Sequence, residues 1–277
     1  MKRAGVMGWP VDHSRSPLLH GFWLREYRIE GEYVLLPVQP QDLATSLRVL
    51  PKRGFAGCNL TIPHKEAALA ILDRVDDRAS RIGAVNTVVV LPDGKLEGRN
   101  TDAFGFSANL GQALPNWRAD AGPAVVLGAG GAARAVVAAL IDGGAPEIRL
   151  VNRTDARAVA LAAGQGEKVR SYAWNERRQV LAGAALLVNA TSLGQRGQPP
   201  LELSLDALPR EAVVNDIVYV PFETPLLTAA RHRGNRVVDG LGMLLHQARP
   251  GFAAWFGVMP EVPPALRAAL VADLAKR

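Results

Sequence analysis

Residues 125–140 read VVLGAGGAARAVVAAL, an apolar run, a glycine-rich turn and an alanine-rich helical pattern in immediate succession. This is the sequence context of the dinucleotide-binding fingerprint. Gly128 permits a tight turn, Gly130 lets the backbone approach a pyrophosphate, and the small Ala133 lets helix and strand pack closely. Backbone N–H groups at the start of the helix, helped by its dipole, would hold the phosphates. The stretch therefore predicts a dinucleotide cofactor at this turn.

The segment after the next strand-like run indicates which dinucleotide. It reads Asn152-Arg153-Thr154, where a site that prefers NAD usually carries an acidic residue for the ribose 2′-hydroxyl. An arginine there is able to pair with, and stack beside, a 2′-phosphate. We therefore expect NADP as the cofactor, with an ordinary exposed arginine as the alternative interpretation of Arg153.

Apolar, β-branched segments alternate with helical patterns along the whole chain. This alternation favours an α/β fold with mostly parallel sheets. The strands are expected at residues 3–9, 33–38, 84–90, 124–127, 148–151, 185–189, 213–218 and 236–239. The helical patterns cover residues 104–114, 132–141, 156–163, 243–255 and 265–275.

Two domains are expected, because a helical stretch after residue 101 leads through Pro115 and Gly122 into a fresh strand. We predict an N-terminal α/β substrate-binding catalytic domain over residues 1–101, with a mixed, mostly parallel sheet, completed by C-terminal helices of residues 241–277. Residues 102–240 are predicted to form a Rossmann-type NADP-binding domain, with a cleft between the two domains. Pro250 is expected to kink or restart the helix that contains it.

Length and composition suit a globular enzyme of 277 residues, with 48% hydrophobic and 21% charged residues. No stretch is long enough to span a bilayer, and the N-terminus is interrupted by Pro10, Asp12 and Arg15 before a signal core forms. We therefore expect a cytoplasmic protein without a membrane partner. The net charge is +6, but the arginines are scattered rather than gathered into a run, so nucleic-acid binding is not expected.

Metal chemistry is not expected either. The five histidines show no paired ligand spacing, and Cys58 is the only cysteine. Cys58 is interpreted as a small buried hydrophobic residue. His13 and His64 are interpreted as packing or hydrogen-bonding residues.

Four polar clusters stand ahead of the glycine turn. They are Ser14-Arg15-Ser16-Pro17, Asn59-Leu60-Thr61-Ile62-Pro63-His64-Lys65, Gly83-Ala84-Val85-Asn86-Thr87 and Gly98-Arg99-Asn100-Thr101-Asp102. Each has a structural explanation when it is taken singly. Ser16 before Pro17 is able to cap a helix, Asp102 is able to do the same, and most lysines like Lys65 are solvated.

In this order, the clusters resemble the motifs of the shikimate dehydrogenases, enzymes that reduce 3-dehydroshikimate to shikimate with NADPH. The resemblance continues through NATSLG from Asn189, NDIVYVPFETPLL from Asn215 and DGLGMLLHQA from Asp239, and so covers nearly the whole chain. The chain departs from the family at Gln195, where a methionine is common. It also reads Ala248-Arg249-Pro250, where many relatives continue with small or acidic residues.

The resemblance implies a role for individual residues. Lys65 and Asp102 match the catalytic pair. The substrate-binding positions are Ser14, Ser16 and Thr61 at the carboxylate, Asn86 and Gln247 at the ring hydroxyls, and Tyr219 near the carboxylate. The cofactor-binding positions are Gly128, Ala129, Gly130, Gly131, Ala132, Asn152, Arg153, Thr154, Arg157, Thr191, Ile217, Gly240 and Met243, with Asp77 as a further position that is acidic in some members.

The chemistry asks for few protein groups, because NADPH supplies the hydride and the protein supplies position and a proton. Lys65 suits proton donation and Asp102 suits orientation of the ring hydroxyls, although either of two coupled groups could transfer the proton. Two alternatives remain: a relative that also oxidises quinate or uses NAD, and a non-catalytic sensor of shikimate or NADPH. Retention of both Lys65 and Asp102 favours an enzyme. The expected partners are the small-molecule substrate and cofactor, in a monomer or a homodimer.

Overall fold

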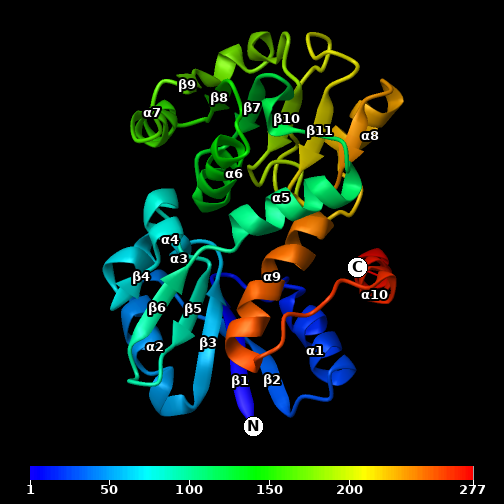
Figure 1. The fold of residues 1–277 in the computed structure, drawn as a ribbon. Helices are drawn as coiled ribbons and strands as arrows, with labels where there is room; N and C mark the ends of the chain where they lie inside the picture. Colours follow the sequence, from blue (N-terminus) through cyan, green and yellow to red (C-terminus); the bar gives the residue numbers. More distant parts are fainter. Residues whose placement is uncertain (277) are drawn as a thin grey trace. The chain divides into compact units, whose positions relative to one another are not determined.

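The computed structural model describes residues 1–276 and divides into two compact units (Figure 1). Unit 1 comprises Met1–Gly105 and Leu245–Asp273, and unit 2 comprises Phe106–Leu244 with the last residues from Leu274. The chain passes from one unit to the other inside three helices, α5 (Asp102–Ala113), α9 (Gly240–Phe256) and the end of α10 (Pro264–Ala275). The sequence places the borders near residues 101 and 240 instead, because a pattern marks where a helix begins and not where it changes its packing partner.

Unit 1 contains a six-stranded sheet in the order β2-β1-β3-β5-β6-β4. Strand β1 pairs in parallel with β2 and β3, and β4 with β6, whereas β5 is antiparallel to both of its neighbours. The expected mixed, mostly parallel sheet is confirmed. The strands are β1 (Lys2–Gly8), β2 (Gly31–Pro37), β3 (Phe55–Leu60), β4 (Arg74–Val75), β5 (Thr87–Val90) and β6 (Leu96–Arg99). The helices of this unit are α1 (Ser16–Glu26), α2 (Leu43–Arg48), α3 (His64–Ala67), α4 (Asp77–Ile82) and α10 (Pro264–Ala275).

Helix α9 passes through Pro250 as a single element, so the expected restart of the helix at this proline is wrong. A proline inside a helix removes one backbone hydrogen bond. Here the following half of the helix is held by tertiary packing, since Phe252 and Trp255 are 0% and 1% exposed. The Trp255 indole N–H also donates to the carbonyl of Val88 at 3.0 Å. These contacts, which the sequence pattern does not reveal, compensate for the lost bond.

Unit 2 contains a fully parallel six-stranded sheet in the order β12-β11-β10-β7-β8-β9. Counted from β7 as the first strand, this is the Rossmann order 3-2-1-4-5-6. The strands are β7 (Ala124–Leu127), β8 (Ile148–Val151), β9 (Val169–Tyr172), β10 (Leu186–Asn189), β11 (Val213–Asp216) and β12 (Arg236–Val238), and the helices are α6 (Gly131–Asp142), α7 (Asp155–Ala163) and α8 (Pro225–His232). Short 3₁₀ turns lie at Pro40–Asp42, Pro51–Arg53, Ala68–Ala70, Ala119–Ala121, Trp174–Glu176 and Gln179–Leu181.

The best-predicted strands are those buried on both faces. All of β7 and β10 is buried, as expected for central parallel strands covered by helices. The expectations missed β3, β4, β6 and β9. Strand β3 reads FAGCNL and β6 reads LEGR, so glycine and polar residues interrupt the apolar pattern.

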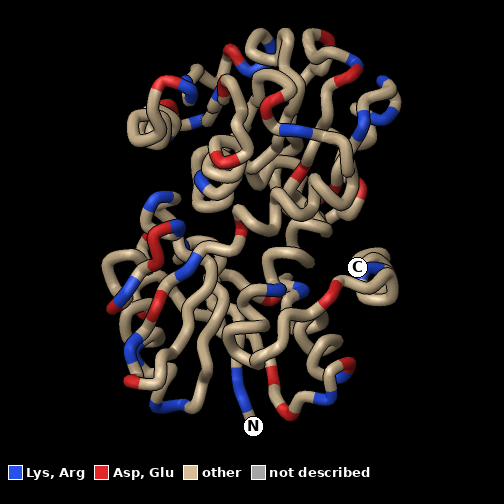
Figure 2. The backbone as a smooth tube through the Cα atoms, in the orientation of Figure 1, with Lys and Arg blue, Asp and Glu red and all other residues tan. Residues whose placement is uncertain are grey.

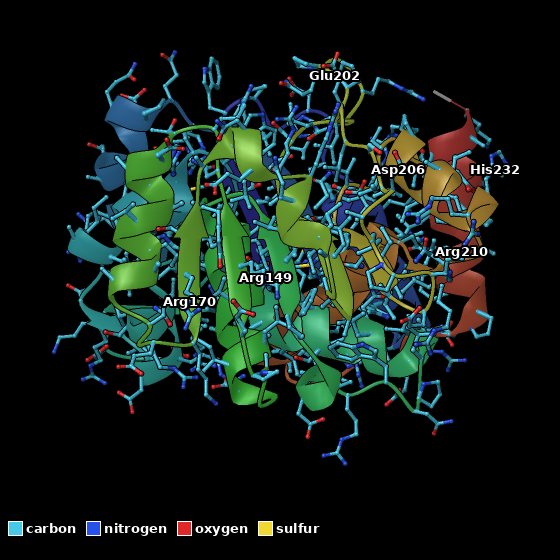
Figure 3. The ribbon with its side chains drawn as sticks, turned by 90° about the horizontal axis from the view of Figure 1, so that it is seen from above. Arg149, Arg170, Glu202, Asp206, Arg210 and His232 are labelled. Atoms are coloured by element: carbon cyan, nitrogen blue, oxygen red, sulfur yellow. The ribbon has the colours of Figure 1, made fainter. Side chains whose placement is uncertain are left out.

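Charged residues interact with one another across strands β8 and β9 of unit 2, near the start of both strands. Arg149 and Arg170 occupy paired positions on these strands (Figure 3). Glu147 pairs with Arg149 at 3.0 Å and with Arg170 at 4.0 Å, which relieves the repulsion between two cations. Lysines and arginines are interspersed with acidic residues along both units (Figure 2). Within residues 1–276, no helix is both long enough and apolar enough to cross a membrane.

Candidate functional site

The polar clusters of unit 1 meet at one edge of its sheet. Strands β1, β3 and β6 all end at this edge, and β5, which runs the other way, begins there. Residues that follow β3 and β6 therefore lie beside the residue that precedes β5. By this topology Thr61, Asn86 and Thr101 come together from three separate sequence segments.

Lys65 and Asp102 form an ion pair at this edge. Lys65, on α3, donates from Nζ to Oδ2 of Asp102 at 2.5 Å. The side chains are 16% and 6% exposed, so the pair is largely removed from water. Asp102 is the first residue of α5, and its backbone N–H donates to Oδ1 of Asn100 at 3.0 Å. Hydrogen bonds thus hold both the main chain and the side chain of Asp102 in place.

Asn86 links this ion pair to its surroundings, and its amide has one defined orientation. Its Oδ1 accepts from the backbone N–H of Thr101 at 2.8 Å, a group that can only donate. The amide Nδ2 therefore faces Asp102 Oδ1 at 2.8 Å and Gln247 Oε1 at 3.2 Å. Both oxygens of Asp102 receive a donor, from Asn86 and from Lys65, and this matches an ionised carboxylate, which only accepts.

A second layer of polar residues supports Asn86. Asn59 donates from Nδ2 to the backbone carbonyl of Asn86 at 3.0 Å and to Oγ1 of Thr87 at 3.2 Å. The hydroxyl of Tyr33 donates to Oδ1 of Asn59 at 2.6 Å. Burial raises the pKa of Tyr33, so this hydroxyl remains a donor. No role was predicted for Asn59 or Tyr33. The available signal was that Asn59 opens one of the four polar clusters.

The serine segment Ser14-Arg15-Ser16 lies between β1 and α1. Ser16 is 5% exposed and is the first residue of α1, and its backbone N–H donates to the Ser14 hydroxyl at 3.3 Å. The N-cap position is occupied by Arg15, without a capping side chain, so the alternative of Ser16 as a cap is wrong. Arg15 pairs with Asp273 of α10 at 2.5 Å and donates to the carbonyl of His13 at 3.0 Å. These contacts anchor the segment on both sides.

Thr61 approaches the end of β1 from β3. Its backbone N–H donates to the carbonyl of Met7 at 2.9 Å. A Cβ on Gly8 would lie 2.4 Å from the Thr61 methyl group, so glycine is required there. His64, next in this motif, is buried and its Nε2 lies 2.8 Å from the carbonyl of Val38. This agrees with its interpretation as a hydrogen-bonding residue.

The glycine turn of unit 2 connects β7 to α6, and its glycines serve different purposes. Gly128 has a φ of +113°, and a Cβ there would lie 2.7 Å from the carbonyl oxygen of Ala190, so the fold itself demands glycine. A Cβ on Gly130 would meet nothing within 4 Å. Gly130 is the N-cap of α6, and no side chain caps this helix. Open space beside an uncapped helix start fits a phosphate group, which backbone N–H groups bind.

The segment after β8 contains the predicted 2′-phosphate residues. Arg153 and Arg157 are exposed, and Arg153 forms no ion pair within residues 1–276. Asn152 donates from Nδ2 to the carbonyl of Thr154 at 2.9 Å, which shapes the turn into α7. Thr154 is the N-cap of α7 and makes no side-chain capping bond. The turn therefore holds a cationic side chain at its surface.

Four further predicted cofactor residues lie in unit 2. Thr191, Ile217 and Gly240 follow the ends of β10, β11 and β12, and Met243 lies on α9. Thr191 donates its hydroxyl to Oδ1 of Asn189 at 2.7 Å and accepts from the backbone N–H of Leu193 at 3.0 Å. A Cβ on Gly240 would lie 2.3 Å from the carbonyl oxygen of Ile217, so this glycine allows close backbone contact. Met243 is 7% exposed on α9.

Two predicted residues lie in a different unit from the group to which they were assigned. Tyr219, predicted with the substrate residues, is half-buried in unit 2, whereas the other five belong to unit 1. Asp77, predicted near the cofactor, is an exposed residue of unit 1 at the start of α4, where Asp76 provides the capping bond to Ala79 at 2.6 Å. Residues 1–276 contain no group of three or more His, Cys, Asp or Glu side chains arranged to hold a metal ion.

Comparison with known proteins places this geometry in a family. The family profile described as "Shikimate dehydrogenase substrate binding domain" matches residues 6–88, and the one described as "Shikimate / quinate 5-dehydrogenase" matches residues 113–196. The chain is 61% identical over 265 residues to the shikimate dehydrogenase (NADP(+)) of Paramagnetospirillum magneticum, with 96% of each chain covered. This chain belongs to the shikimate dehydrogenase family. The enzyme of the same name from Rhodospirillum rubrum is 60% identical over 272 residues, covering 97% of this chain and 96% of that one.

Solved structures agree with the family assignment. Shikimate 5-dehydrogenase from Thermus thermophilus, in complex with NADP(H) and shikimate, has a TM-score of 0.87 at 40% identity and covers 99% of this chain and 100% of its own. Quinate dehydrogenase from Corynebacterium glutamicum, in complex with NAD, has a TM-score of 0.90 at 33% identity, covering 98% of this chain and 100% of its own. The fold is thus shared by members whose named substrates and cofactors differ.

Proposed function

We propose that this chain is an NADP-dependent oxidoreductase that reduces 3-dehydroshikimate to shikimate reversibly. The observation that carries the proposal is the buried Lys65–Asp102 ion pair, whose carboxylate is oriented by Asn86. The family assignment and relatives at about 60% identity named shikimate dehydrogenase (NADP(+)) support the same activity. The partners that we propose are small molecules, in a monomer or a homodimer.

Lys65 is the proton donor in this proposal. When a carbonyl is reduced, its carbon gains a hydride and its oxygen gains a proton. The bound NADPH supplies the hydride. An ammonium group has three N–H donors, and Asp102 takes one from Lys65. The other two remain for the substrate oxygen, to stabilise its developing negative charge and to protonate it.

Asp102 holds Lys65 and the ring hydroxyls in place. In this proposal its two oxygens accept from Lys65 and Asn86. It therefore acts as a fixed anion that orients the lysine. Asn86 and Gln247, hydrogen-bonded to each other at 3.2 Å, are the proposed partners of further ring hydroxyls.

The substrate carboxylate is assigned to Ser14, Ser16 and Thr61, with Tyr219 as a further contact. Hydroxyl groups bind a carboxylate by donating to its oxygens. Since Arg15 is paired with Asp273, the segment offers neutral donors rather than a free cation. Recognition then depends on where these hydroxyls lie.

For the cofactor, the turn of residues 128–132 would hold the pyrophosphate at the start of α6. Arg153, assisted by Asn152, Thr154 and Arg157, would bind the 2′-phosphate. An arginine pairs with phosphate through two parallel N–H donors, which explains a preference for NADP over NAD. Thr191, Ile217, Gly240 and Met243 are assigned to the adenosine and nicotinamide ends, and Asp77 remains a lesser candidate.

The direct test is to add shikimate to the purified protein with NADP⁺ and to follow NADPH formation by its absorbance. Parallel reactions with quinate and with NAD⁺ serve as matched controls. We expect the shikimate and NADP⁺ combination to have the highest kcat/KM. A protein that binds shikimate without turnover would be a sensor, and the proposal would then be wrong.

A further inference from the structure

A buried carboxylate at the end of β11 is not used by the function proposed above. Asp216 is 1% exposed and accepts three hydrogen bonds. Oδ1 accepts from Nδ2 of Asn189 at 2.9 Å and from the backbone N–H of Val218 at 3.0 Å, and Oδ2 accepts from the hydroxyl of Thr224 at 2.7 Å. Burying a carboxylate is unfavourable unless such bonds compensate. The fold therefore keeps a carboxylate in its interior although burying it costs free energy.

The first arm of this network reaches the loop after β10. Asn189 is 0% exposed. Because an ionised carboxylate can only accept, the Nδ2 group of Asn189 faces Asp216. The Oδ1 of Asn189 is thereby directed at Thr191, whose backbone N–H and hydroxyl donate to it at 3.1 and 2.7 Å. Nδ2 also donates to the carbonyl of Leu193 at 3.1 Å. The orientation of one amide thus shapes residues 190–193.

The second arm reaches the loop after β11. Asp216 accepts from Val218 in this loop, and the backbone N–H of Ile217 donates to the carbonyl of Asn189 at 3.0 Å. Further along, the backbone N–H of Arg196 donates to the carbonyl of Val220 at 2.7 Å. The two loops are therefore bound to each other, with Asp216 at their junction.

Both loops lie where a dinucleotide is expected in a doubly wound sheet. Strands β7 and β10 are parallel neighbours at the centre of the sheet. The strands that follow β7 are added on one side of this pair, and those that follow β10 on the other. In such a sheet, ligands bind at the carboxyl ends of the strands beside this switch point. The loop after β10 contacts the glycine turn, because Gly128 packs against the carbonyl of Ala190 and the Ala190 N–H donates to Leu127 at 2.8 Å. The shape of this loop thus bears directly on the turn.

We propose that Asp216 is a positioning residue for the cofactor: through Asn189 and Val218 it holds residues 190–193 and 217–219 in the shape that receives NADP(H). This inference rests on the proposed function, and it assigns Asp216 no contact with the cofactor or the substrate. It also explains the NATSLG and NDIVYVPFETP motifs. Asn189 of the first motif and Asp216 and Thr224 of the second form the network.

The test compares three variants by steady-state kinetics with shikimate and NADP⁺. Asp216→Ala removes all three acceptor bonds, and we expect the KM for NADP⁺ to rise about tenfold, the effect of about 1.4 kcal/mol, with the KM for shikimate unchanged within about twofold. Asp216→Asn retains Oδ1 as acceptor for Asn189 and Val218 and is expected to restore the KM for NADP⁺ to near the wild-type value. Thr224→Val is the matched control, because it removes a bond to the same carboxylate and the N-cap of α8 but leaves both loops attached.

A merely structural role predicts a different pattern. In that case Asp216→Ala and Thr224→Val would lower the melting temperature and leave both KM values unchanged, or would raise both KM values together, and either result overturns the inference. Should Asp216→Ala not fold, Asn189→Ala replaces it, since it cuts the same connection from the loop side. A wild-type protein without shikimate turnover would refute the proposed function instead, and NADPH binding measured by fluorescence would then test Asp216 separately.

Discussion

The polar cluster of unit 1 and the glycine turn of unit 2 are built in opposite ways. In the cluster, Lys65, Asn86 and Asp102 each have a defined partner, and the asparagine is in turn supported by Asn59. At the turn, the start of α6 has no capping side chain, Gly130 faces open space and Arg153 is exposed. One region is preorganised by side chains, whereas the other is left open by the lack of them.

The difference follows from the chemistry that each region is proposed to perform. Proton transfer requires a donor within hydrogen-bonding distance of one atom, and a side chain keeps such a position only if its neighbours fix it. A pyrophosphate is bound by backbone N–H groups, which any small residue offers. Substitutions in the two regions should therefore change different kinetic parameters: kcat at the Lys65–Asp102 pair and the KM for the cofactor at the glycine turn.

The largest effect is expected at Lys65. Lys65→Ala should lower kcat by about 10²-fold or more, the scale of losing general acid–base catalysis, with a smaller change in the KM for shikimate. Lys95→Ala is the control, because Lys95 is 55% exposed and pairs with the surface carboxylate of Asp93. Stopped-flow or steady-state rates at saturating substrate measure the change. A near-wild-type kcat would remove Lys65 from the reaction.

A pH effect on stability is expected next in size, at Asp216 in unit 2. Burial raises the pKa of Asp216 from 3.8 to about 6. Between these pH values the folded protein binds more protons than the unfolded chain, so this contribution to stability is fully present below about pH 4 and is lost as the pH rises through 6. Asp216→Asn has no charge to bury and therefore avoids this loss. It should raise the free energy of unfolding at pH 7 by about 3 kcal/mol, since the pKa is raised by about two units and each unit corresponds to about 1.4 kcal/mol.

Urea denaturation at pH 4 and pH 7 measures this difference. The exposed Asp206, labelled in Figure 3, supplies the control variant Asp206→Asn, which should change little at either pH. If Asp216→Asn is no more stable than wild type at pH 7, burial does not penalise the charged carboxylate as argued.

The serine segment of unit 1 should affect binding rather than chemistry. Ser14→Ala combined with Ser16→Ala is expected to raise the KM for shikimate about tenfold, the lower end of the effect of losing hydrogen bonds to a charged group, which contribute about 1.5–3 kcal/mol. The kcat should stay near wild type, since the carboxylate is held alike in the ground and transition states. Ser80→Ala, at an exposed position on α4, is the control. A pure kcat defect would contradict carboxylate binding by these serines.

The smallest effect is expected at Arg153, on the open side of the comparison. Arg153→Ala should raise the KM for NADPH about fivefold and leave that for NADH nearly unchanged, because exposed ion pairs contribute about 1 kcal/mol or less. Arg170→Ala, which removes an exposed arginine from β9 in the same unit, controls for the general loss of charge. Equal changes in both KM values would show that Arg153 does not distinguish the two cofactors.

The sequence was most informative where a short stretch contains the whole feature. The turn of residues 128–133 combines its strand, glycines and helix within a few residues, so local steric and packing requirements suffice to predict it. The strands that it missed, such as β3 and β6, carry glycine and polar residues whose burial depends on neighbours distant in the chain. The expected restart of the helix at Pro250 was wrong for the same reason, because packing of Phe252 and Trp255 holds the second half of α9.

By itself, the sequence determined the α/β class, the Rossmann topology of unit 2, the dinucleotide turn and, through its ordered motifs, the family. Only the tertiary structure decided which residues hold one another. The partners of the Asn86 side chain come from the link between β6 and α5, from α5 itself and from α9. Those of Asp216 come from β10 and the start of α8. Hydrogen bonds are short-ranged and directional, so a residue's partners are set by distances and angles in space, and separation along the chain does not encode them.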